Sequence, residues 1–292
     1  MTAPCISIVI PAYRHEAYIA ETLASIARQP VRDVEVIVVD DGSPDGTLAI
    51  ARKLAADYPL PITVVGQTNA GTCAALNHGL RLARGEFFAM IASDDAFAED
   101  RLSAQLAAFK AQPTLEVVYG NGRFWNGKSR SGRMHDQTVL TLLGQKPHAI
   151  YAALCKRDYP LFIQTALFRT AALRTVGGFD EVVGVDDWPL NIRLFRHFTD
   201  SRQYAVIDQD LVLYRQHPQQ QYRDRFSWAA RKVRVIEAYC PPEWRNAALA
   251  RQYWLAGREL MYASIALEPR LGRLLRFAGS ALEKLVKSWL SR

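Results

Sequence analysis

The first 120 residues alternate short β-branched runs with segments of helical periodicity, and this alternation constrains the fold more than any other feature of the chain. A buried strand is expected at 6–10, and further strands at 34–39, 62–65, 86–92 and 115–119. Between them, helices are expected at 17–28, 47–58, 72–83 and 101–111. Strands that alternate with helices indicate βαβ units and a parallel sheet with helices on both faces. Right-handed crossovers then place all the carboxyl ends of the strands along one edge.

The pattern weakens after residue 120. Residues 120–150 are rich in Gly, Ser, Arg and Lys, and we interpret them as an irregular excursion. Beyond it, strands are expected at 162–168 and 204–214, and helices at 171–176 and 189–197. The chain after His217 is expected to be helical to its end. We therefore predict an α/β domain over residues 1–217 and a basic helical extension over 218–292.

Composition limits the class of protein. Hydrophobic residues make up 49% of the chain and charged residues 22%, which is typical of a folded globular protein. The four cysteines are widely spaced without a C-x-x-C pair, which argues against a disulfide scaffold or zinc module and favours a reducing compartment. No apolar run approaches the roughly 18 residues that span a bilayer. No basic segment precedes the first apolar run, so a signal peptide is not expected.

Polar clusters stand where three of the predicted strands end: Pro11–Tyr13, Asp40–Ser43 and Ser93–Asp95. Ligands of open α/β sheets bind beyond the carboxyl ends of the strands. Two adjacent carboxylates are unfavourable unless a cation lies nearby, and hard oxygen ligands favour Mg²⁺ or Mn²⁺, which usually also bind phosphates. The alternative for any single Asp-Asp pair is a helix N-cap or a solvated turn. Two pairs at two strand ends make that alternative much weaker.

These clusters, in this order and spacing, resemble the signature of the family 2 glycosyltransferases. The motifs are Ile8–Tyr13, Val39–Ser43, Asn69–Gly71, Asn77–Gly79, Gly85–Glu86, Ser93–Asp95, Gly177–Asp180, Asp186–Trp188 and Tyr214–His217. The resemblance covers residues 5–217. It implies the GT-A fold, an α/β sandwich that binds a nucleotide sugar, with a nucleotide-binding half (1–120) and an acceptor half (121–217).

The resemblance also implies roles for single residues. Asp41 matches the acid that accepts a hydrogen bond from a uracil-type base, and Asp94 matches a residue that faces the ribose or sugar. Asp95 matches the ligand of a divalent ion, Mn²⁺ or Mg²⁺, that bridges the diphosphate. His217 matches a residue that completes the metal sphere or contacts the diphosphate, although a structural role is an equal alternative. The remaining matched positions in the nucleotide-sugar site are Pro11, Ala12, Tyr13, Asn69, Gly71 and Asn77.

The sequence departs from the family pattern at three positions. Ala92 stands where the usual Asp-x-Asp-Asp segment begins, so Asp95 alone is left to anchor the metal. Leu76 replaces the usual Arg and removes one phosphate contact. Asp186 shortens the usual Glu-Asp pair by one methylene group.

A second acidic pair is the candidate catalytic site. An inverting transfer needs a base that takes a proton from the acceptor hydroxyl. The resemblance assigns this role to Asp187, with Asp186 orienting it or contacting the acceptor. The alternative is that both acids cap the helix expected to begin near Pro189.

The last quarter of the chain is basic. Residues 218–292 hold 14 Lys and Arg against 6 Asp and Glu, while the rest of the chain holds 22 against 23. Apolar residues from Leu271 to Trp289 form one helical stripe, and the other face of 270–292 is basic. Such a helix can bind an anionic membrane surface. The alternatives are that the stripe packs on the helices over 244–267 or on a second copy of the chain, as in a homo-oligomer.

The leading expectation is an inverting, metal-dependent glycosyltransferase of cell-surface polysaccharide biosynthesis. Its donor would be a UDP- or dTDP-sugar and its acceptor a saccharide or lipid-linked saccharide. We expect a cytoplasmic protein, peripheral on the inner face of the cell membrane if the tail binds lipid. One alternative is a nucleotide-sugar-binding protein without efficient transfer, suggested by Ala92. The other is nucleic-acid binding through the basic tail, which is not expected because the basic residues line an amphipathic helix.

Overall fold

The computed structural model describes residues 4–217 and 225–267. The chain divides into two compact units. The first unit holds Met1–Leu154 and Tyr159–Gln220, and the second holds Cys155–Asp158 and Gln221–Arg292.

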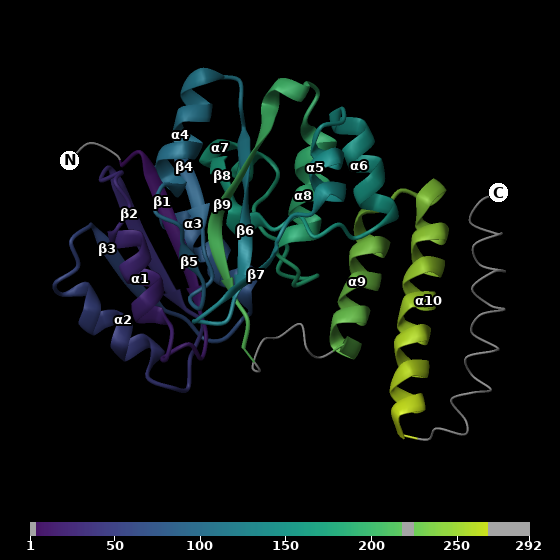
Figure 1. Ribbon diagram of the computed structural model, residues 1–292, viewed down its shortest axis with the longest axis horizontal. Coiled ribbons are helices and arrows are strands. Elements are labelled where there is room, and N and C mark those ends of the chain that lie inside the picture. Colours follow the sequence, from purple (N-terminus) through teal and green to yellow (C-terminus); the bar gives the residue numbers. More distant parts are fainter. Residues whose placement is uncertain (1–3, 218–224, 268–292) are drawn as a thin grey trace. The chain divides into compact units, whose positions relative to one another are not determined.

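Within the described residues, the first unit contains a nine-stranded sheet of order β3-β2-β1-β4-β8-β6-β9-β5, with β7 paired to β6 (Figure 1). The strands are β1 (Ile6–Ala12), β2 (Val34–Asp40), β3 (Ile62–Gly66), β4 (Phe87–Met90), β5 (Ala96–Phe97), β6 (Val117–Trp125), β7 (Arg130–Arg133), β8 (Ala166–Arg169) and β9 (Tyr204–Arg215). The helices are α1 (Ile19–Ala27), α2 (Thr47–Ala55), α3 (Thr72–Leu82), α4 (Arg101–Ala111), α5 (Gln137–Leu143), α6 (Pro147–Lys156), α7 (Thr170–Thr175) and α8 (Asp187–His197), with 3₁₀ turns η1 (Ile163–Thr165) and η2 (Ser201–Gln203).

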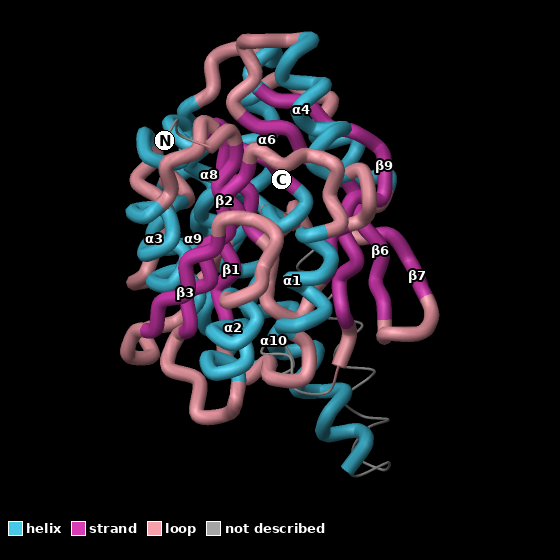
Figure 2. The backbone as a smooth tube through the Cα atoms, turned by 90° about the vertical axis from the view of Figure 1, so that its left-hand side faces the viewer, coloured by secondary structure: helices cyan, strands magenta, loops and turns pink. Residues whose placement is uncertain are grey.

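The first four predicted strands form the parallel part of the sheet. β1 pairs in parallel with β2 and β4, and β2 pairs in parallel with β3. Ile8 of β1 belongs to the same apolar cluster as Ile19 and Leu23 of α1. On the opposite face α3 packs so closely that a Cβ at Gly79 would lie 2.3 Å from Cγ1 of Val9. Figure 2 shows α1 and α3 on opposite sides of these strands. Helices therefore cover both faces, as the β-branched runs predicted.

Six strands share one direction and three oppose it. β8 pairs antiparallel with both β4 and β6, and β9 pairs parallel with β6, so β6 and β9 run the same way as β1 to β4. β5, β7 and β8 run the other way. The prediction of a mainly parallel sheet is confirmed, and the five strands expected in the first 120 residues all end at one edge, because β1 to β4 and β6 run the same way. β5, β7 and β8, which that prediction did not include, end at the other edge. β5 and β7 follow β4 and β6 without an intervening helix, whereas β8 follows α5, α6 and η1 and lies antiparallel between β4 and β6.

Residues 120–150 are not irregular, so that prediction is wrong. β6 continues to Trp125, β7 returns from it, and α5 and α6 follow. Both helices bury apolar side chains at helical spacing: Val139, Leu142 and Leu143 in α5, and Ile150 and Leu154 in α6. The abundant Gly, Ser, Arg and Lys residues belong mainly to the exposed hairpin turn that precedes these helices and concealed their periodicity.

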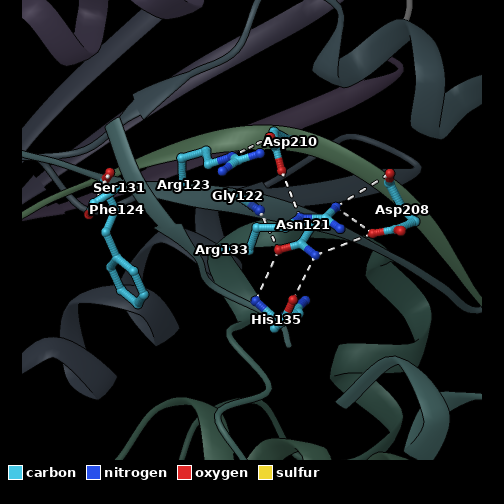
Figure 3. Close-up of polar contacts among 9 residues, drawn as sticks. All are labelled: Asn121, Gly122, Arg123, Phe124, Ser131, Arg133, His135, Asp208 and Asp210. Atoms are coloured by element: carbon cyan, nitrogen blue, oxygen red, sulfur yellow. Dashed lines mark hydrogen bonds and ion pairs between the residues drawn. The ribbon is translucent and has the colours of Figure 1, made fainter. Parts of the chain in front are cut away.

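The β6–β7 hairpin is anchored on β9 by charged side chains. Nε of Arg123 on β6 donates to Oδ2 of Asp210 on β9 at 2.7 Å, and Nε of Arg133 on β7 donates to Oδ1 of the same carboxylate at 3.3 Å. Arg133 also forms an ion pair with Asp208 (Figure 3). Both strands of the hairpin are thus held to the strand that leads to the carboxyl edge of the sheet.

The remaining elements agree with the sequence except at their ends. α8 begins at Asp187, two residues before the predicted start, and the strand expected from residue 162 begins only at Ala166, after η1. The second unit contains the helices α9 (Arg225–Tyr239) and α10 (Pro242–Leu267). Among the described residues, no helix combines the length and hydropathy needed to cross a bilayer. The basic amphipathic helix expected over 270–292 lies outside the described residues.

Candidate active site

Three loops at the carboxyl edge of the sheet bring two histidines and an aspartate together. His15 follows β1, Asp94 follows β4 and His217 follows β9. Nε2 of His217 lies 2.9 Å from Oδ2 of Asp94, and Nδ1 of His15 lies 3.7 Å from Oδ1 of the same carboxylate. One potential ligand atom from each residue lies within 4.8 Å of the others. Imidazole and carboxylate groups at these distances can hold a divalent transition-metal ion.

His15 sits among groups that suit a metal ligand, and the sequence reasoning missed it. Burial lowers the pKa of His15, although the charge of Asp94 acts in the opposite direction. The lowered pKa favours the neutral imidazole, which is the form that binds metals. Its Nδ1 lies 2.7 Å from Oγ of Ser93, and its ring centroid lies 5.8 Å from that of Tyr18 and 5.7 Å from that of His217. The available signal was its place in the loop after the first strand, where ligand contacts gather in such folds.

Asp95 lies in a different environment from its neighbour Asp94. Its Oδ1 accepts a hydrogen bond from the main-chain N–H of Arg215 at 2.8 Å. Its Oδ2 is buried and has no hydrogen-bond partner among the residues that the structure describes. Burial, and then the charge of Asp94, raise the pKa of Asp95 well above its ordinary value. Asp95 does not belong to the cluster of His15, Asp94 and His217.

Helix α1 holds the loop that carries both aspartates. Oγ1 of the buried Thr22 lies 2.9 Å from the carbonyl oxygen of Ser93 and 2.7 Å from that of Asp95. Oγ of Ser25, one turn later, accepts a hydrogen bond from the N–H of Phe97 at 3.0 Å. These hydroxyls lie in the buried stripe of an amphipathic helix, where the periodicity alone predicts only packing. They compensate main-chain groups that would otherwise be buried without partners.

Four residues of the predicted nucleotide-sugar site lie together at the ends of β1 and β2. Pro11 and Ala12 are buried and Tyr13 is half-buried. The main-chain N–H of Asp41 donates to the carbonyl oxygen of Ala12 at 2.8 Å, which continues the pairing of the two strands into their loops. The structure therefore brings these four predicted residues to one place on the carboxyl edge.

The Asp41 carboxylate organises the loop that precedes α3. Its Oδ1 accepts hydrogen bonds from Nε2 of Gln67 at 2.9 Å and from the N–H of Ala70 at 2.8 Å, and its Oδ2 accepts one from the N–H of Gly71 at 2.8 Å. Asn69, in the same loop, is exposed. Asp41 thus fixes the main chain around two other predicted binding residues, Asn69 and Gly71.

The side-chain amide of Asn77 forms hydrogen bonds within the protein. Its Nδ2 donates to the carbonyl oxygen of Phe179 at 2.8 Å and to Oε1 of Glu181 at 2.7 Å, and its Oδ1 accepts from the N–H of Phe179 at 2.8 Å. Gly178 makes this approach feasible, because its φ is +67° and a Cβ there would lie 2.6 Å from Oδ1 of Asn77. Asn77 therefore joins α3 to the loop that leads to Asp186 and Asp187.

Asp186 and Asp187 lie at the start of α8. The side chain of Asp186 makes no capping hydrogen bond to the helix, and Oδ1 of Asp187 accepts one from the N–H of Trp188 at 2.6 Å. Both acids lie near the first turn of α3. Burial raises the pKa of Cys73 in that turn, and the charges of Asp186 and Asp187 are among those that raise it further. The start of α3 is at the carboxyl edge of the sheet, so the second acidic pair lies at the same edge as Asp94.

Residues 7–177 match the family described as glycosyl transferase family 2. A PGL/p-HBAD biosynthesis glycosyltransferase of Mycobacterium tuberculosis is 32% identical over 198 residues, which cover 67% of this chain and 71% of the relative. The uncharacterized glycosyltransferase EpsJ of Bacillus subtilis is 29% identical over 223 residues, which cover 74% of this chain and 62% of EpsJ. The chain thus spans less than two thirds of the length of EpsJ.

Solved structures share the architecture of the first unit. TarS 1–349 of S. aureus, in complex with UDP-GlcNAc, has a TM-score of 0.63 and 23% identity, and the match covers 85% of this chain and 71% of that chain. The mannosyltransferase PcManGT from Pyrobaculum calidifontis, in complex with GDP-Man and Mn²⁺, has a TM-score of 0.59 and 23% identity, with coverage of 99% and 84%. The chain has the GT-A fold and belongs to glycosyl transferase family 2.

Proposed function

We propose that this protein transfers a sugar from a nucleoside-diphosphate donor to a saccharide or lipid-linked acceptor, with inversion at the anomeric carbon. The observation that carries the proposal is the cluster of His15, Asp94 and His217 at the carboxyl edge of the sheet. Membership of glycosyl transferase family 2 supports the class of reaction. We place the reaction in cell-surface polysaccharide biosynthesis on the resemblance to that branch of the family.

We propose that the base of a UDP- or dTDP-sugar binds at the ends of β1 and β2. An ionised carboxylate offers about four lone-pair positions for hydrogen bonds. Asp41 receives three from the protein, and we assign the fourth to the ring N–H of a uracil-type base. Tyr13 is half-buried at the same place and offers an aromatic face on which a base can stack. We assign Asn69 and Gly71, in the loop that Asp41 holds, to contacts with the rest of the donor.

We assign the metal site to Asp94, His217 and His15. In this assignment Asp94 takes the ligand role that the family resemblance implies for Asp95. Two imidazoles and one carboxylate suit Mn²⁺ better than Mg²⁺, because Mg²⁺ prefers oxygen ligands. When bound, the ion supplies Lewis-acid stabilisation of the charge that develops on the departing nucleoside diphosphate.

Asp187 is assigned as the catalytic base. Its carboxylate takes the proton of the acceptor hydroxyl while that oxygen forms the new bond to the anomeric carbon. The bond from the anomeric carbon to the diphosphate oxygen breaks on the opposite face, which inverts the configuration. Asp186 lies beside it at the N-cap position of α8, and we assign it to orient the base or the acceptor.

We assign donor binding to residues 1–120 and acceptor binding to residues 121–217. Residues 218–292 form the basic extension of this proposal. β7, β9 and the second half of β6 lie in the acceptor half. The pairing of β6 with β9 extends from Val117↔Tyr204 to Trp125↔Arg215, at the end of β9 where His217 follows. Binding of an anionic membrane surface through 270–292 remains part of the proposal.

A thermal-shift series with UDP, dTDP and GDP, each with and without Mn²⁺, tests the donor and metal assignments. A ligand that binds only the native state adds about 2.7 kcal/mol of stability at a hundredfold excess over its dissociation constant. We expect UDP or dTDP to raise the melting temperature more than GDP does, and Mn²⁺ to increase that shift. A chain that none of the nucleotides stabilises, with or without Mn²⁺, contradicts the proposed function.

A further inference from the structure

Arg215 contacts both aspartates of the loop after β4. It is the last residue of β9, and 8% of its side chain is exposed. Its Nε donates to the carbonyl oxygen of Asp94 at 2.7 Å, and its main-chain N–H donates to Oδ1 of Asp95 at 2.8 Å. One residue therefore holds the main chain of the first aspartate and the side chain of the second.

The guanidinium group is itself held on several sides. Its Cζ lies 4.1 Å from the ring centroid of Trp125 on β6 and 5.0 Å from that of Tyr18, the residue before α1. A terminal nitrogen pairs with Glu21 of α1. A buried arginine is stable only with such partners, and a planar guanidinium that both stacks and donates has few alternative orientations.

Trp125, the aromatic partner of Arg215 on β6, is held in place by hydrogen bonds around it. The carbonyl oxygen of Trp125 accepts a hydrogen bond from the N–H of Gln216 at 2.6 Å, beside the guanidinium. The hairpin that carries Trp125 is anchored on β9 through Arg123, Arg133 and Asp210 (Figure 3). Arg215 is therefore set in a rigid frame made by α1, β6 and β9.

We infer that Arg215 is a positioning residue that presets Asp94 to bind the metal ion together with His15 and His217. The inference rests on the metal assignment of the proposed function. By fixing the Asp94 carbonyl, Arg215 fixes the main chain from which the carboxylate projects. Groups that orient a ligand in this way commonly change metal affinity by about 10- to 100-fold when they are removed.

The direction in which Mn²⁺ affinity changes on loss of Arg215 distinguishes a positioning role from a purely electrostatic one. A positive charge beside a cation site repels the cation, so loss of the charge alone would strengthen Mn²⁺ binding. Loss of a positioning contact weakens it instead. Arg215→Gln therefore tests both explanations at once, because they predict changes in opposite directions.

Arg169 offers a matched control at the opposite edge of the same sheet. Its guanidinium lies 5.3 and 5.5 Å from the ring centroids of Phe87 and Phe109, donates to the carbonyl oxygen of Leu115 at 2.8 Å, and pairs with Glu86. Arg169→Gln thus removes a similarly stacked and paired arginine without touching the Asp94 loop.

The experiment measures Mn²⁺ binding to the UDP complex by calorimetry, with melting temperatures and metal-free UDP binding recorded for each protein. We expect Arg215→Gln to weaken Mn²⁺ binding about 10-fold or more, Arg215→Lys to weaken it less, and Arg169→Gln to leave it unchanged. UDP binding without metal should survive in all three. If Arg215→Gln does not fold, Arg215→Lys, which keeps the positive charge but cannot reproduce the planar contacts, should still weaken Mn²⁺ binding.

Unchanged or tighter Mn²⁺ binding in Arg215→Gln overturns the inference, as does equal weakening in Arg169→Gln, which would indicate general loosening of the fold. If Arg215→Gln does not fold, unchanged binding in Arg215→Lys overturns it. Failure of the wild-type UDP complex to bind Mn²⁺ overturns the metal assignment itself and the inference with it. That failure is distinguishable because it occurs without any substitution.

Discussion

Nε2 of His217 lies 2.9 Å from Oδ2 of Asp94, although 123 positions separate the two residues in the chain. β4 and β9 run in the same direction within one sheet, so the loops after both strands emerge at the same edge. His15 reaches the same carboxylate from the loop after β1. The site is thus a consequence of strand direction, which places residues from three distant segments around one aspartate.

Exchanging each aspartate for asparagine distinguishes Asp94 from Asp95 as the metal ligand. We expect Asp94→Asn to weaken Mn²⁺ binding by at least about 10-fold, because the cluster loses its carboxylate. Asp95→Asn should have a smaller effect, since an amide oxygen can still accept the hydrogen bond from Arg215. Titration of Mn²⁺ into the UDP complex of each variant checks the order. The reverse order would identify Asp95 as the ligand.

Asp187→Asn should keep donor binding and lose transfer. An amide cannot take the acceptor proton, and loss of a general base typically lowers the rate by about 10²- to 10⁴-fold. The measurement is turnover of the donor with acceptor present, alongside UDP binding. Glu181→Gln is the control, because it removes a neighbouring charge while leaving an oxygen to accept from Asn77. Full activity of Asp187→Asn would exclude this residue as the base.

Gly79→Ala should destabilise the first unit. The added Cβ would lie 2.3 Å from Cγ1 of Val9 in the buried strand β1, so α3 has to move away from the sheet. Overpacking of this kind costs about 1–3 kcal/mol in the free energy of unfolding. Urea unfolding measures the loss. Gly132→Ala, at an exposed glycine with no atom within 4 Å of the new Cβ, should cause a much smaller change.

His135 should make stability depend on pH. It is fully buried: Nδ1 donates to the carbonyl oxygen of Gly120 at 2.9 Å, and Nε2 accepts from the N–H of Phe162 at 3.0 Å. Its main-chain N–H and carbonyl oxygen bind the buried Asn121 (Figure 3). Burial lowers the pKa of His135 to about 4.

The direction in which pH changes the stability follows from the lowered pKa of His135. Above pH 6.5 the imidazole is neutral in both states, and the native contacts contribute fully. Below about pH 6.5 the unfolded chain takes up a proton that the native state refuses until about pH 4, so stability falls across that window. Between pH 7.5 and 5.5 we expect a loss of about 1 kcal/mol in the free energy of unfolding. His135→Gln should show a smaller loss over the same interval, and an equal loss would rule out His135 as its source.

The sequence by itself determined the βαβ core. The runs of β1, β2 and β4 are β-branched or aromatic and end in polar clusters, and the helices between them show clear periodicity, so local patterns agreed with the tertiary fold. Asp41, Asp94 and Asp95 were visible for the same reason, since each follows a strand and strand ends gather at one edge, whereas Asp186 and Asp187 were identified through the family resemblance. The hairpin and helices of residues 120–156 were not visible, because their exposed polar turn masked the apolar spacing.

Only the tertiary structure decided how those acids differ. Asp94 and Asp95 are identical in type and adjacent, but a turn directs one toward two histidines and buries the other against the end of β9. The parts played by His15, Thr22 and Arg215 likewise depend on contacts between segments far apart in the chain. Local sequence carries the period of each element, whereas side-chain orientation at a shared edge is set by which elements pack there.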